Sequence, residues 1–147
     1  MKPGDVFKWI KFPEPQFGQE IKTRWFIYLG HTTTPFEQPI LAHICTTTTS
    51  VNDFKTGGKR ASHKCFIFEK GKYPFDQECV LDYAEDPYAY KKADLESNRN
   101  IELMGKLNDQ TMRVIYEGIY SSRSYSRKIK MDIRESLQQI GIKGLRK

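Results

Sequence analysis

Short apolar runs separated by turn-forming residues fill the first half of the chain. Runs of this kind are typical of β-strands when proline or glycine bounds them. The clearest is WFIYLG at residues 25–30, a near-continuous apolar segment that predicts a buried strand. We expect five strands in this region, at residues 6–12, 25–30, 40–45, 65–68 and 79–81.

The apolar period becomes helical in the last third of the chain. Apolar residues recur at helical spacing over residues 112–119 and again over residues 129–140. Asn108 can cap the first helix, the second begins near Ser126, and Gly141 is expected to end it. Strands followed by two helices predict an α+β fold, in which the helices cover one side or end of the sheet.

The length of the chain is that of one domain. We assign residues 1–147 to a single domain in which residues 123–147 form a C-terminal helical extension. No stretch approaches the roughly 20 consecutive apolar residues of a membrane span, so we expect a cytoplasmic protein without a membrane partner. The three cysteines are widely spaced, which predicts reduced thiols in strands and no zinc site.

Charge is distributed unevenly along the chain, whose formal net charge is +6. Residues 1–75 hold eleven Lys and Arg against six Asp and Glu, residues 76–96 two against seven, and residues 97–147 eleven against five. Basic segments attract polyanions such as nucleic acids. One side of the second predicted helix could bind RNA or an acidic protein segment, or be a solvated face, and it carries Arg127, Lys130 and Arg134.

The first candidate site lies just before the apolar run at residue 25. Gly18, Glu20, Lys22 and Arg24 place a carboxylate and two cations in a loop that leads into a buried strand. A guanidinium can stabilise the negative charge of phosphoryl transfer, and a partly buried Glu20 could act as a general acid or base. The same residues are also consistent with a surface ion pair between Glu20 and Arg24.

Two further features are compatible with nucleic-acid binding. Thr46 and Thr47 end a predicted strand and could donate hydrogen bonds to phosphate oxygens, although threonine is also common in strands for steric reasons. The segment KTGGKRASHK at residues 55–64 contains Lys59 and Arg60. It could follow a single-stranded nucleic acid as a mobile basic arm, or it could be a solvated hairpin tip.

Four short motifs follow one another along the chain. They are PGDVFKW at residues 3–9, GQE at 18–20 with Arg24 and an apolar strand after it, ICTT at 44–47, and GKLND at 105–109 before a helix. In order and spacing they resemble the MazF/PemK family of toxin ribonucleases. The resemblance covers most of residues 3–120.

The resemblance implies a small SH3-like β-barrel with C-terminal helices, usually a homodimer, that cleaves single-stranded RNA by attack of a ribose 2′-hydroxyl on the adjacent phosphate. It implies no metal or other cofactor, and it implies a cognate antitoxin protein as partner. By position, Arg24 would stabilise the phosphate transition state or donate a proton, Thr46 would hold a phosphate oxygen, and Glu20 would be an acid or base. The RNA would be positioned by Lys22, Thr47, Lys59 and Arg60.

At one position the chain departs from the family. Members usually carry proline after the arginine, whereas Trp25 stands there in this chain. The difference favours an alternative, a non-catalytic SH3-like barrel that binds RNA or a protein partner. Cleavage of long RNA in the presence of EDTA separates the two hypotheses.

Overall fold

The strands of the chain form two antiparallel sheets. The computed structural model describes residues 1–14, 22–36 and 38–147. The strands in these ranges are β1 (Asp5–Trp9), β2 (Arg24–His31), β3 (Leu41–Thr46), β4 (Cys65–Phe68), β5 (Cys79–Asp82), β6 (Tyr88–Lys91) and β7 (Ile101–Lys106). The larger sheet has the strand order β6-β3-β2-β1-β7, and β4 pairs with β5 in the smaller one.

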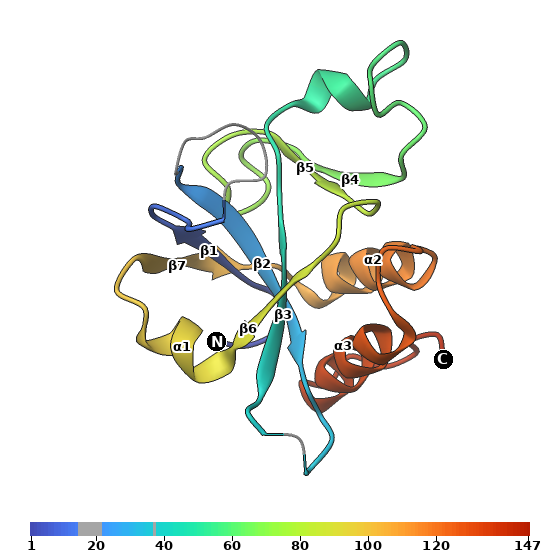
Figure 1. The fold of residues 1–147 in the computed structure, drawn as a ribbon. Helices are drawn as coiled ribbons and strands as arrows, with labels where there is room; N and C mark the ends of the chain where they lie inside the picture. The colour runs from blue at the N-terminus through green and yellow to red at the C-terminus, as the bar shows by residue number, and fades with distance from the viewer. Residues whose placement is uncertain (15–21, 37) are drawn as a thin grey trace.

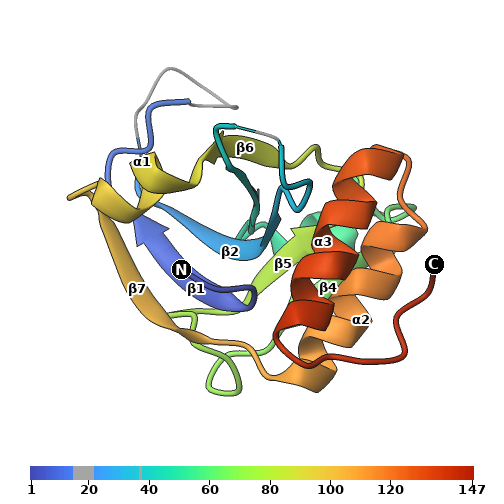
Figure 2. The ribbon, with the colours of Figure 1, turned by 90° about the horizontal axis from the view of Figure 1, so that it is seen from below.

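The helices lie on both sides of the larger sheet. They are the 3-10 helix η1 (Val51–Phe54) and the α-helices α1 (Lys92–Ser97), α2 (Asp109–Tyr120) and α3 (Arg127–Gln139). Helices α2 and α3 lie side by side on one flank of the sheet, while α1 connects β6 to β7 (Figures 1 and 2). The fold is therefore α+β, as predicted. Within the described ranges, no helix is long and apolar enough to cross a membrane.

The larger sheet is curled, and β2 is buried on both of its faces. Ile27 belongs to the core shared with α2, α3 and the smaller sheet, whereas Phe26 belongs to an aromatic cluster on the opposite face. In that cluster the rings of Trp9 in β1 and Tyr90 in β6 lie 5.1 Å apart, although two strands separate β1 from β6. For the part of the chain that is described, the sheet stays open, with β6 and β7 at its edges.

Most of the predicted elements are confirmed. The runs at residues 25–30, 40–45, 65–68 and 79–81 correspond to β2, β3, β4 and β5, and all three cysteines lie in strands with free thiols. The first strand is shorter than predicted, because it ends at Trp9 and Lys11 has a positive φ of 57°.

The apolar pattern did not predict β6, α1 or β7. In β6 the rings of Tyr88 and Tyr90 pack against the same aromatic cluster. The strand is short and follows an acidic stretch, so its sequence alone does not indicate a strand. Gly105 and Lys106 are the end of β7, and the helix begins only after Asn108.

Both C-terminal helices begin as their sequences predicted. The Asn108 side chain accepts a hydrogen bond from Thr111 N (2.8 Å), and the Ser126 hydroxyl accepts one from Ile129 N (3.2 Å). Gly141, with a φ of 95°, follows the end of α3. Each cap satisfies a backbone N–H that the first helical turn leaves without an intrahelical partner.

Helix α3 is part of the central core. Ile133 and Leu137 are fully buried in the same cluster as Ile27 of β2. The backbones of α3 and β2 approach closely at Gly30, since a Cβ atom at this position would lie only 3.0 Å from the Cα atom of Ile133. The C-terminal residues that the sequence analysis assigned to an extension therefore cover one face of β2.

A buried hydrogen bond connects α3 to β3. His43 Nε2 donates to Asp132 Oδ2 at 2.9 Å, and both side chains are almost completely buried. Lys128 Nζ donates to the other carboxylate oxygen at 2.8 Å. Burial raises the pKa of the Asp132 carboxyl, but the hydrogen bonds from Lys128 and His43 outweigh this effect, so the pKa lies below its usual range.

Replacement of Asp132 by asparagine should remove an acid-sensitive part of the stability. A carboxyl whose pKa is lower in the folded than in the unfolded state stabilises the fold above its unfolded pKa, and this stabilisation is lost as the pH falls through the folded value. The free energy of unfolding of the wild type should therefore fall more steeply than that of Asp132→Asn below about pH 4. Urea titrations from pH 7 to pH 2 measure both profiles, and parallel profiles would contradict the assignment.

Gly118 is required by close packing of α2 on the segment after β5. A Cβ atom at this position would lie 2.1 Å from Cζ of Tyr83, well inside van der Waals contact. Alanine would normally favour a helix over glycine by about 1 kcal/mol. At this site the ring leaves no room for the extra methyl group.

Gly118→Ala should lower the free energy of unfolding by about 1–3 kcal/mol, because overpacking exceeds the gain in helix propensity. The same substitution in a Tyr83→Ala background should be neutral or stabilising, since the ring is then absent. Chemical denaturation of the four proteins of this cycle gives the coupling. A stabilised Gly118→Ala protein with Tyr83 intact would show that the packing is looser than described.

Candidate functional site

A groove of about 580 Å³ lies where β2 begins and β3 ends. Because the two strands are antiparallel, with Phe26 opposite Thr46, the residues before β2 lie beside the residues after β3. The groove is lined by residues from β1, from both of these ends and from the connection between β4 and β5: Lys8, Lys22, Thr23, Arg24, Trp25, Thr47, Thr48, Thr49, Ser50, Phe75, Asp76, Gln77 and Cys79.

Three cations contribute to the groove. Lys22 and Arg24 come from the start of β2, as the sequence predicted, and Lys8 comes from the neighbouring strand β1. The Lys8 ammonium lies 5.8 Å from the centre of the Trp25 ring and 3.5 Å from Glu102 Oε2. The groove therefore combines positive charge with an aromatic surface, which is suitable for the backbone and bases of a single-stranded nucleic acid.

Hydroxyl-bearing residues that follow β3 also line the groove. Thr47 N donates to the Trp25 carbonyl at 3.3 Å, and Thr48 exchanges two backbone hydrogen bonds with Val80 of β5, at 2.8 and 2.9 Å. Ser50 N donates to the Thr48 hydroxyl at 3.2 Å. The threonine run thus passes from the larger sheet to the smaller one, and backbone hydrogen bonds hold it on both sides.

Thr46, the predicted phosphate ligand, does not line this groove. Its side chain is buried, and the hydroxyl donates to the Trp25 carbonyl at 3.0 Å. Thr47, the predicted RNA-binding residue, lines the groove directly. Glu20, the predicted acid or base, lies outside the described residues.

Cys79 also lines the groove, but its chemistry is limited. Burial raises the pKa of the Cys79 thiol to about 11, although a hydrogen bond with the Thr47 side chain lowers it. The thiol is therefore protonated at neutral pH, and a protonated thiol is a poor nucleophile. The groups that the groove offers to a ligand are therefore its cations and hydroxyls.

Lys59 and Arg60 do not line the groove. Arg60 Nη1 lies 3.4 Å from Asp82 Oδ2, and His63 Nδ1 lies 3.0 Å from the same buried oxygen. The Arg60 guanidinium also covers the ring of Phe54, at 5.5 Å from its centre. The segment expected to be a mobile arm or a hairpin tip is thus folded back onto β5, while Lys59 remains exposed.

Glu85 is a partly buried acid that is influenced by the charges of Arg60 and Arg24. Burial raises the pKa of the Glu85 carboxyl, the positive charges of Arg60 and Arg24 lower it, and nearby acidic groups raise it further. The net result is a pKa above the usual range of a glutamate. Perturbed carboxyls of this kind are frequent at functional sites.

Sequence reasoning missed Glu85 and the groove residues Phe75 and Asp76. Glu85 lay in an acidic stretch whose element could not be predicted, so nothing placed it near Arg24. Phe75 and Asp76 belong to the long connection between β4 and β5, whose path depends on the pairing of these two strands. A phenylalanine next to an aspartate between two predicted strands was the only available signal.

Comparison with protein-family models, with curated proteins and with solved structures gives no match for this chain. The function is therefore argued from the geometry of the groove.

Asp82→Asn should release the basic segment from β5, since it removes the charge that Arg60 and His63 share. Amide hydrogen exchange at residues 55–64 should become faster, and trypsin should cut there sooner, while the sheet keeps its protection. Asp86→Asn, which alters an exposed acid four residues later, is the matched control. Equal exchange in the two variants would mean that Asp82 does not hold the segment.

Proposed function

We propose that the chain is an endoribonuclease toxin of the MazF/PemK type, which cleaves single-stranded RNA in the Arg24 groove without a metal ion. One observation carries the proposal: the cations at the start of β2 and the hydroxyl-bearing residues after β3 line a single groove. Guanidinium and hydroxyl donors that line one groove are suited to a phosphodiester.

The proposed reaction proceeds through the RNA's own 2′-hydroxyl. The 2′-oxygen bonds to the adjacent phosphorus, and the bond from phosphorus to the 5′-oxygen breaks. The 2′-hydroxyl gives up a proton and the 5′-oxygen gains one, so the products are a 2′,3′-cyclic phosphate and a 5′-hydroxyl end. Arg24 would stabilise the extra negative charge on the phosphate oxygens.

Two carboxyls are candidates for the proton transfers. Burial raises the pKa of the Glu85 carboxyl, and the positive charge of Arg24 lowers it, but Glu85 is not among the residues that line the groove. Asp76 lines the groove itself. The proposal assigns the transfers to Asp76, because a general acid or base has to reach the proton that it transfers.

The proposal extends to the assembly. The curled sheet, in which β1 and β6 approach one another through Trp9 and Tyr90, is interpreted as an SH3-like barrel with C-terminal helices. A homodimer in the cytoplasm, inhibited by a cognate antitoxin that blocks the RNA groove, completes the proposal.

A second candidate is a non-catalytic module that binds single-stranded RNA. It is favoured by the hydrogen bond from the Thr46 hydroxyl to the Trp25 carbonyl. In the catalytic hypothesis this hydroxyl would instead donate to a phosphate oxygen. The Trp25 ring, 5.6 Å from Phe75, offers an aromatic surface for a base. Binding without cleavage needs no proton transfer.

Arg24→Ala should reduce cleavage of a long single-stranded RNA by about 100-fold or more, as loss of a charge-stabilising donor typically does. Arg24→Lys should recover only part of the rate, because lysine lacks the planar pair of donors. Arg99→Ala, which removes an exposed arginine outside the groove, is the control. Gel analysis of RNA in EDTA measures the rates, and circular dichroism checks the fold.

The same assay separates the two candidates. Salt-sensitive RNA binding by the wild type with RNA that stays intact would select the binding module. Full activity of Arg24→Ala would overturn the catalytic assignment of this residue. Absence of both binding and cleavage in the wild type would count against each candidate.

A further inference from the structure

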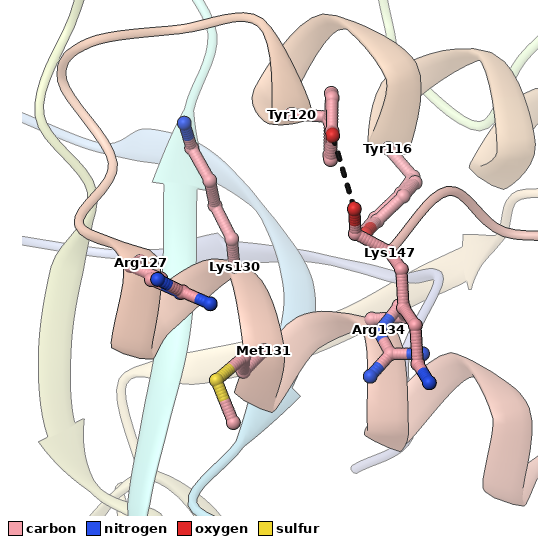
Figure 3. Close-up of a pocket in the computed structure, with 7 residues that line it drawn as sticks. All are labelled: Tyr116, Tyr120, Arg127, Lys130, Met131, Arg134 and Lys147. Carbon is pink, nitrogen blue, oxygen red and sulfur yellow. Dashed lines mark hydrogen bonds between the residues drawn. The ribbon is translucent and has the colours of Figure 1, made fainter.

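A second groove, of about 720 Å³, lies between α2 and α3. Its cations are Arg127, Lys130 and Arg134 from one side of α3 together with Lys147 (Figure 3). Its apolar part comes from Met131, which is 44% exposed, and from the rings of Tyr116 and Tyr120. None of these residues lines the Arg24 groove.

The cations on α3 are not neutralised locally. For the described part of the chain, no carboxylate lies within ion-pair distance of Arg127, Lys130 or Arg134. The acidic residue Asp132 on the same helix points the other way, into its buried pair with His43. The outer side of α3 is therefore a row of positive charge with Met131 in its middle.

The aromatic rings in this groove are already occupied. Tyr116 is buried and its hydroxyl donates to the Arg146 carbonyl, while the Tyr120 hydroxyl donates to Lys147 O at 3.0 Å. The Arg146 guanidinium lies over the Tyr120 ring, 5.3 Å from its centre. Stacking on exposed aromatic rings supplies much of the affinity for single-stranded nucleic acids, whereas in this groove Tyr116 is buried and the Tyr120 ring is already covered by a guanidinium.

The spacing of the charges indicates the kind of partner. Arg127, Lys130 and Arg134 are three and four residues apart, which is about one helical turn, or roughly 5 Å, at each step. Carboxylates one turn apart on a second helix repeat at about the same interval. The flexible thioether of Met131 can accept an apolar side chain between them.

We propose that the groove between α2 and α3 is a docking site for an acidic amphipathic helix of another protein. Glutamates or aspartates of that helix pair with the row on α3, and its apolar residues cover Met131, in the way that helices bind to grooves through residues at i, i+3, i+4 and i+7. This inference is independent of the function proposed for the Arg24 groove.

Fluorescence anisotropy of a labelled helical peptide tests the proposal. The peptide carries Glu at positions i, i+4 and i+7 with Leu beside them, and a matched peptide carries Gln in place of Glu. The full chain should bind the first peptide at low salt, and the triple variant Arg127→Gln/Lys130→Gln/Arg134→Gln should bind it at least about tenfold more weakly. Met131→Glu should weaken binding without removing a cation.

The control variant Lys2→Gln/Lys70→Gln/Lys91→Gln loses the same charge at exposed positions outside the groove and should bind the Glu peptide normally. Thermal melts of both triple variants check the fold. Equal binding of the Glu and Gln peptides, or equal binding by the two triple variants, would overturn the proposal. A different result with oligouridine would also overturn it. If oligouridine displaced the Glu peptide from the wild type and did not bind to the triple variant of α3, the groove would be an RNA-binding surface.

Discussion

Burial of β2 on both faces is the constraint on which the rest of the structure depends. A strand in which apolar and polar residues alternate needs a packed layer on one face only. Residues 26–30 of β2 are all buried, so this strand needs a packed layer on each of its two faces. Helices α2 and α3 provide the first cover and the curled aromatic cluster provides the second. The buried part of the strand begins at residue 26, and the two residues before it, Arg24 and Trp25, are partly exposed.

The elements that the sequence predicted correctly are those with strong local signals. The apolar run of β2 and the caps Asn108 and Ser126 needed no knowledge of the tertiary structure. Strands β6 and β7 gave no such signal. The burial of the β6 tyrosines is explained only by the curl of the sheet, which brings Tyr90 to Trp9 and Tyr88 to Phe12. Short edge strands depend on their neighbours more than on their own composition.

The candidate site was predictable where its residues are close in sequence to a buried strand. Lys22, Arg24 and Thr47 line one groove because antiparallel pairing brings the ends of adjacent strands together. Arg60 was assigned to RNA by its position in a basic run, but its guanidinium lies against Asp82. The sign of a charge is visible in a sequence, whereas the partner that neutralises it is a property of the fold.

The pairing of Thr48 with Val80 connects the two sheets beside the groove. The larger sheet and the smaller sheet each have their own hydrogen-bonded ladder, and this pair of residues connects them beside Arg24. The width of the groove therefore depends on how the two sheets are connected there, as well as on the hydrogen bonds within each sheet.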